Sequence, residues 1–131
     1  MDAGVKGLGN ARLGQVAVPV QNVERATRFY RDVLGLPYLF SAGQLSFFDC
    51  GGVRIMLDRP ENKEFDHPSS VLYFSVPDIH GAYQRLLDGG VAIVEPPKII
   101  AAMPDHDLWM SFFRDTEGNV MSVMSEVPRK S

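Results

Sequence analysis

Three histidines could act as metal ligands or as general bases, because imidazole changes its protonation state near neutral pH. His106 lies in the sequence Asp105-His106-Asp107, on a loop that leads into a predicted strand. Loops of this kind often line pockets, so His106 could be a ligand or a base, although we favour the simpler interpretation that it caps a turn. We expect His67 in a linker and His80 exposed in the first turn of a helix, without chemical roles.

Arg54 is the best candidate for binding an anion. A guanidinium that points inward is costly unless it is paired, so Arg54 should meet an acidic side chain or the anionic group of a ligand. Glu95 or Asp58 could be the internal partner. Tyr73 and Trp109 could supply ring surfaces for a flat apolar ligand, and Trp109 could equally belong to the core.

Two segments with the same design would position these side chains. Residues 16–20 form a predicted strand, Asn22 is a predicted helix N-cap, and apolar residues at helical spacing continue over 23–33 until Gly35. Residues 71–90 repeat this order without a gap, with a strand over 72–76, Asp78 as the N-cap, a helix over 79–87, and Gly89-Gly90 at its end.

Three short β-prone segments follow each predicted helix: residues 38–42, 45–49 and 53–57 in the first half, and 91–95, 108–114 and 120–125 in the second. Each half is therefore a βαβββ unit, which predicts an α+β fold. We expect a single domain over residues 1–131, with module one at 12–57, a linker at 58–70 and module two at 71–126. The prolines within 96–106 predict an irregular loop.

One helix for four strands covers only one face of each sheet, so the other face should form a concave cup. Alternation along the strands predicts which residues line this cup. They include Gln15, Arg54, Met56, Tyr73, Ser122 and Met124, beside Ala17, Pro19, Val71, Ser75 and Val120. The two methionines are typical packing residues, and their flexible thioethers also suit a pocket that adapts to its ligand. Such a mixed face favours a small-molecule site, to which we add His106 and Trp109 as candidates.

The composition argues against several classes of partner. The net charge is -3 and the basic residues are scattered, which disfavours nucleic acid. The apolar runs are much shorter than the ~20 residues that span a bilayer. No secretory signal is evident, and the lone Cys50 cannot form an internal disulfide, so we expect a cytoplasmic protein and assign Cys50 no chemistry.

The paired modules, the segment 26–36 (ATRFYRDVLGL) and the turn 114–119 (RDTEGN) resemble the glyoxalase, bleomycin-resistance and extradiol-dioxygenase superfamily, also called vicinal oxygen chelate proteins. The resemblance covers roughly residues 12–127. It implies two βαβββ modules whose curved mixed sheets surround a concave cup. It says little about activity, because one scaffold serves isomerases, epimerases, lyases, dioxygenases, thiol transferases and drug-sequestering proteins.

The resemblance also implies where a divalent metal would bind. The corresponding positions are Gln15, Met56, Val71 and Ser122, and only Gln15 is a ligand that the family uses. The cations of this family prefer oxygen and imidazole ligands. The thioether of Met56, the side chain of Val71 and the neutral hydroxyl of Ser122 are poor ligands for them. We therefore expect no metal and no other cofactor.

These observations favour a metal-independent protein that sequesters or senses a small, partly aromatic or anionic molecule. The alternative is a lyase, epimerase or dioxygenase with one divalent ion in a rearranged site that uses Gln15 and His106. A purely structural module is the least favoured hypothesis. The resemblance further implies a homodimer, and the cup could lie within one chain or be shared between two.

Overall fold

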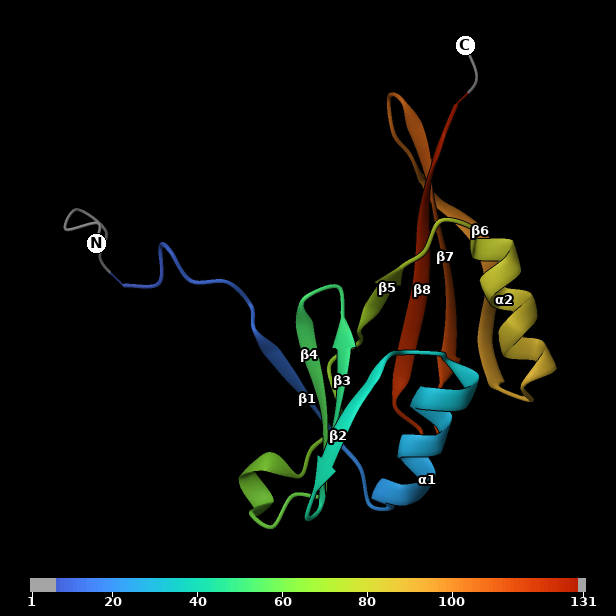
Figure 1. Cartoon of the computed structure of the whole chain (residues 1–131). Helices are drawn as coiled ribbons and strands as arrows, with labels where there is room; N and C mark the ends of the chain where they lie inside the picture. The colour runs from blue at the N-terminus through green and yellow to red at the C-terminus, as the bar shows by residue number, and fades with distance from the viewer. Residues whose placement is uncertain (1–6, 130–131) are drawn as a thin grey trace.

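The computed structural model describes residues 7–129, which form two modules of the same element order (Figure 1). Module one contains β1 (Gln15–Pro19), α1 (Val23–Arg28), β2 (Tyr38–Ala42), β3 (Leu45–Cys50) and β4 (Val53–Asp58). Module two contains β5 (Tyr73–Ser75), α2 (Ile79–Asp88), β6 (Ala92–Ala102), β7 (His106–Arg114) and β8 (Val120–Pro128). The predicted α+β fold with two βαβββ modules is confirmed.

Each module builds one four-stranded mixed sheet, in the order β1-β4-β3-β2 and β5-β8-β7-β6. The first strand of each module pairs in parallel with the last, and the remaining neighbours are antiparallel. A short helical turn, η2 (Lys63–Phe65), lies in the segment that joins the modules. Within residues 7–129, no helix is long and apolar enough to cross a membrane.

Both helices begin at the predicted N-caps. The side-chain oxygen of Asn22 accepts a hydrogen bond from Arg25 N at 3.0 Å, and that of Asp78 accepts one from Gly81 N at 3.1 Å. After Arg28 the first helix widens into a turn of π-helix, η1 (Phe29–Val33), which the spacing of apolar residues did not predict.

The helix-facing sides of both sheets share one hydrophobic core. Val18, Ile55 and Leu57 of the first sheet are buried in the same cluster as Phe113 and Val123 of the second. This confirms the predicted alternation in β1 and β4, because Val18, Ile55 and Leu57 were assigned to the helix side and are buried. In β8 the alternation does not separate buried from exposed residues, since Ser122, predicted on the concave side, is also fully buried. The opposite faces of both sheets consequently point away from this core.

The turn at residues 114–119 ties module two to the start of α1. Tyr30, fully buried, donates a hydrogen bond from its hydroxyl to Asp115 Oδ2 at 2.7 Å. The carboxylate of Glu117 accepts from the backbone N–H groups of Gln21 and Asn22 at 2.8 and 3.1 Å. The position of α1 over the first sheet is therefore set partly by the second module.

The prediction of an irregular loop over residues 96–106 is wrong. Strand β6 continues through Pro96 and Pro97 as far as Ala102, with register shifts on either side of the prolines. Because β6 is an edge strand that pairs only with β7, a residue without an N–H group costs little on its free side. His106 consequently begins β7 instead of lying in a loop.

Candidate functional site

Gln15, Arg54 and Met56 lie together on the face of the first sheet that points away from the helices. Gln15 stands directly opposite Arg54 in the parallel pairing of β1 and β4. Arg54 Nε donates a hydrogen bond to Gln15 Oε1 at 2.8 Å, and Gln15 Nε2 donates to Met56 Sδ at 3.6 Å. The glutamine thus holds the guanidinium in one orientation.

Two phenylalanines extend this group. The guanidinium carbon of Arg54 lies 5.1 Å from the ring centroid of Phe47, within the range of a cation–π contact. The Phe47 ring is stacked on that of Phe40, with 4.6 Å between centroids. Phe47 is largely covered, whereas Phe40 is 46% exposed. We call Gln15, Arg54, Met56, Phe47 and Phe40 the arginine face.

Arg54 retains donors for a further partner. Within residues 7–129 it makes no ion pair, and neither acidic residue considered from the sequence contacts it. Glu95 instead pairs with Lys98 at 2.7 Å, and Asp58 lies at the far end of β4, opposite Leu45. Because Arg54 is exposed, its charge needs no internal partner, and its terminal nitrogens can bind an anion from solution.

Tyr73, Ser122 and Met124 lie on the corresponding face of the second sheet. Tyr73 pairs with Ser122, and its ring meets Phe112 edge-on with 5.9 Å between centroids. Tyr73 is 48% exposed and Met124 is partly exposed. Ser122 is fully buried, and its hydroxyl donates to the backbone oxygen of Ser111 at 2.9 Å. Tyr73 and Met124 could therefore touch a ligand, whereas the Ser122 hydroxyl is already engaged.

The structure does not bring Trp109 and His106 to Tyr73. Trp109 packs on the helix side of the second sheet, with its ring 4.9 Å from that of His80 on α2. His106 is six positions along β7 from Phe112, about 20 Å in an extended strand. Its Nδ1 lies 2.7 Å from Asp105 Oδ1, and this hydrogen bond lowers the pKa of the Asp105 carboxyl.

The residues at the family's metal positions do not fit a divalent cation. The side-chain oxygen of Gln15 already faces the positive charge of Arg54. Met56 offers a thioether, Val71 has no donor atom, and the Ser122 hydroxyl is bonded to the backbone. In the described part of the chain, no group of three or more His, Cys, Asp or Glu residues could hold a metal ion.

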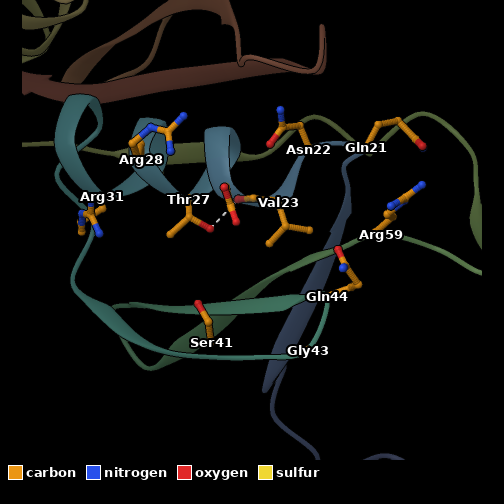
Figure 2. A pocket seen from close by; sticks show the side chains of 11 residues that line it. Gln21, Asn22, Val23, Thr27, Arg28, Arg31, Ser41, Gly43, Gln44 and Arg59 are labelled. Atoms are coloured by element: carbon orange, nitrogen blue, oxygen red, sulfur yellow. Dashed lines mark hydrogen bonds between the residues drawn. The ribbon is translucent and has the colours of Figure 1, made fainter.

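Among the surface depressions within residues 7–129 are five with volumes from about 110 to about 620 Å³, and none of these five is lined by a residue of the arginine face. The largest lies between α1 and the turn that joins β2 to β3, on the helix side of the first sheet (Figure 2). Because Arg54 and Phe40 are exposed, the arginine face is an open surface in a single chain.

The family model described as the Glyoxalase/Bleomycin resistance protein/Dioxygenase superfamily matches residues 12–123. The chain therefore belongs to this superfamily, as its two modules and the fold of its sheets also indicate. No curated protein matches the chain.

Several solved structures share the fold. TnmS3, an antibiotic binding protein from Streptomyces sp. CB03234, is 22% identical with a TM-score of 0.73, over 92% of this chain and 99% of that one. A lactoylglutathione lyase from Agrobacterium tumefaciens is 21% identical with a TM-score of 0.68, over 88% and 93%. The integron cassette protein VCH_CASS1 from the mobile metagenome of V. cholerae is 24% identical with a TM-score of 0.71, over 88% and 94%. These likenesses concern the fold alone.

Proposed function

We propose that this chain binds a small aromatic anion without a metal ion, and that it serves to sequester or sense that compound. The observation that carries the proposal is the arginine face, where a guanidinium with unused donors lies beside exposed aromatic surface. A carboxylate or phenolate would pair with the terminal nitrogens of Arg54, while the ring of the ligand would lie against Phe40.

The arrangement favours binding because the arginine is held in place before the ligand arrives. Gln15 fixes the guanidinium through the 2.8 Å hydrogen bond, and the Phe47 ring supports its flat side. Less side-chain freedom is then lost on binding than for a free surface arginine. The name of TnmS3, an antibiotic binding protein of the same fold, is consistent with such a role.

We further propose that a second copy of the chain closes the site. Tyr38, Leu39 and Phe40 of the edge strand β2 are exposed, as are Ile99 and Ile100 of the edge strand β6. A homodimer would cover part of this apolar surface and turn the open arginine face into a pocket. We place the protein in the cytoplasm, in keeping with its single cysteine.

Catalysis is not part of the proposal. A lyase, epimerase or dioxygenase of this superfamily that depends on a metal would need donors that Met56, Val71 and Ser122 do not supply. The arginine face itself, made of Gln15, Arg54, Met56, Phe47 and Phe40, contains none of the side chains that usually act as nucleophile or general base.

A thermal-shift screen followed by calorimetric titration would test the proposal. The panel should contain aromatic carboxylates such as benzoate and naphthoate, with the neutral amides as counterparts. We expect carboxylates to bind and Arg54→Ala to weaken them about tenfold or more, the value of a hydrogen bond to a charged group. Arg28→Ala, which removes an exposed arginine from α1 on the other side of the sheet, is the matched control. Equal binding by wild type and Arg54→Ala would refute the assignment.

A further inference from the structure

An apolar recess of about 110 Å³ lies where the two modules meet, on the helix side of the second sheet. Phe113 and Val123 of this sheet and Leu86 of α2 are the buried part of its lining. The rest of its apolar lining is only partly buried and comes from η1 and the residues after it, from β5 and from α2: Val33, Leu34, Leu36, Phe74, Val76 and Ala82. The recess is therefore apolar inside and reachable from solvent. We call it the module recess.

Among the described residues that line the module recess, Arg85 alone is polar. Its guanidinium is already engaged, because Nε donates to Val33 O at 2.8 Å and Nη2 donates to Asp32 O at 3.4 Å. Arg85 is also exposed, so its charge needs no ligand to balance it. The recess consequently offers a ligand mainly dispersion contacts and the removal of apolar surface from water.

The module recess cannot close by a simple approach of α2 to η1, because the two elements already touch at two points. A Cβ at Gly89, the C-cap of α2, would lie 2.7 Å from Val33 Cγ1. A Cβ at Gly35, which follows η1, would lie 2.8 Å from Arg85 Nη2. Voids are costly and shrink when their surroundings can relax, whereas these backbone contacts limit such relaxation. In addition, η1 is a turn of π-helix, a form found frequently at functional sites.

We propose that the module recess binds a small uncharged apolar molecule of the size of one aromatic ring. An apolar cavity of about 150 Å³ stays dry and binds benzene or xenon. The module recess is somewhat smaller, but a ring can extend through its open side. A polar ring of the same size is disfavoured, because its oxygen atoms would lose hydrogen bonds to water without gaining donors in the recess. The proposal goes beyond the binding of an aromatic anion, since the arginine face lies on the side of the first sheet that points away from the helices.

NMR titration of the full chain with benzene, followed through the backbone amide signals, would test the inference. Dioxane, a ring of similar size with two oxygen atoms, is the polar counterpart. We expect benzene to cause saturable shifts at Leu34, Val76 and Leu86, with a Kd of about 1 mM, and none around Arg54. Dioxane should bind about tenfold more weakly or less.

Ala82→Leu should abolish the benzene shifts, because the added carbon atoms fill the module recess from α2. Ala102→Leu makes the same change at an exposed position of β6 and is the matched control. Arg54→Ala should bind benzene like the wild type, which separates this inference from the proposed function. Circular dichroism would show whether each variant is folded, and the map of shifts in the wild type decides the question even if Ala82→Leu is not.

Four results would overturn the inference. They are the absence of saturable shifts in buffer saturated with benzene, shifts centred on exposed apolar residues elsewhere, equally tight binding of dioxane, and unchanged benzene binding by folded Ala82→Leu.

Discussion

Replacing Tyr30 by Phe should destabilise the protein through one hydrogen bond. The Tyr30 hydroxyl, which is fully buried, donates to Asp115 Oδ2 at 2.7 Å. Oδ2 also accepts from Asn119 Nδ2, and Oδ1 accepts from the backbone N–H groups of Glu117 and Asn119. The substitution keeps the ring in place but removes one donor from a buried carboxylate, which costs about 1.5–3 kcal/mol. For a chain of this size that lowers Tm by about 5–15 °C.

Urea unfolding followed by circular dichroism, together with thermal melting, would measure this loss. Tyr83→Phe is the matched control, because the Tyr83 hydroxyl makes no hydrogen bond within residues 7–129 and its removal should change Tm little. If Tyr30→Phe melted within about 1 °C of the wild type, the hydrogen bond between Tyr30 of η1 and Asp115 would contribute nothing to the joining of the modules, and this part of the reasoning would be wrong.

Three further predictions concern stability. Burial and the neighbouring Asp115 raise the pKa of Tyr30 well above its usual value, so the unfolded chain loses this proton first above about pH 10. The wild type should then lose stability with rising pH more steeply than Tyr30→Phe, as urea unfolding at pH 9 to 11 (roughly the span around an ordinary tyrosine) would show. Gly35 has φ +76°, and a Cβ there would lie 2.8 Å from Arg85 Nη2, so Gly35→Ala should cost about 1–2 kcal/mol in urea unfolding, whereas Gly14→Ala should be nearly neutral. Glu117→Ala removes the acceptor of two backbone N–H groups at the start of α1 and should cost about 1–3 kcal/mol, and an unchanged unfolding midpoint would contradict that role.

Most helices and strands were predictable because the capping residues and the alternation of apolar residues in the sequence agree with the burial seen in the structure. Asn22 and Asp78 mark the helix starts, and the alternation of apolar residues assigns the faces of β1 and β4. The continuation of β6 beyond residue 95 was missed because two adjacent prolines usually end a regular element, whereas a free strand edge tolerates them. Local sequence does not show which strand will lie at an edge.

The candidate site was predicted in part. Gln15, Arg54 and Met56 meet as their strand positions indicated. Phe47 was missed because it adjoins Phe48, and alternation cannot tell which of two neighbouring phenylalanines faces the core. Trp109 could have been placed correctly, since it shares a face with the buried Phe113 four residues later in the same strand.

Calorimetric titration of an aromatic carboxylate into protein treated with a chelator tests the central claim most directly. It should be repeated with nickel, zinc, manganese or iron(II) added, with bound metal counted by elemental analysis. We expect the same affinity with and without metal, a loss of affinity in Arg54→Ala, and almost no bound metal. Binding that appears only with about one ion per chain, and is lost in Gln15→Ala or His106→Ala, would contradict the claim.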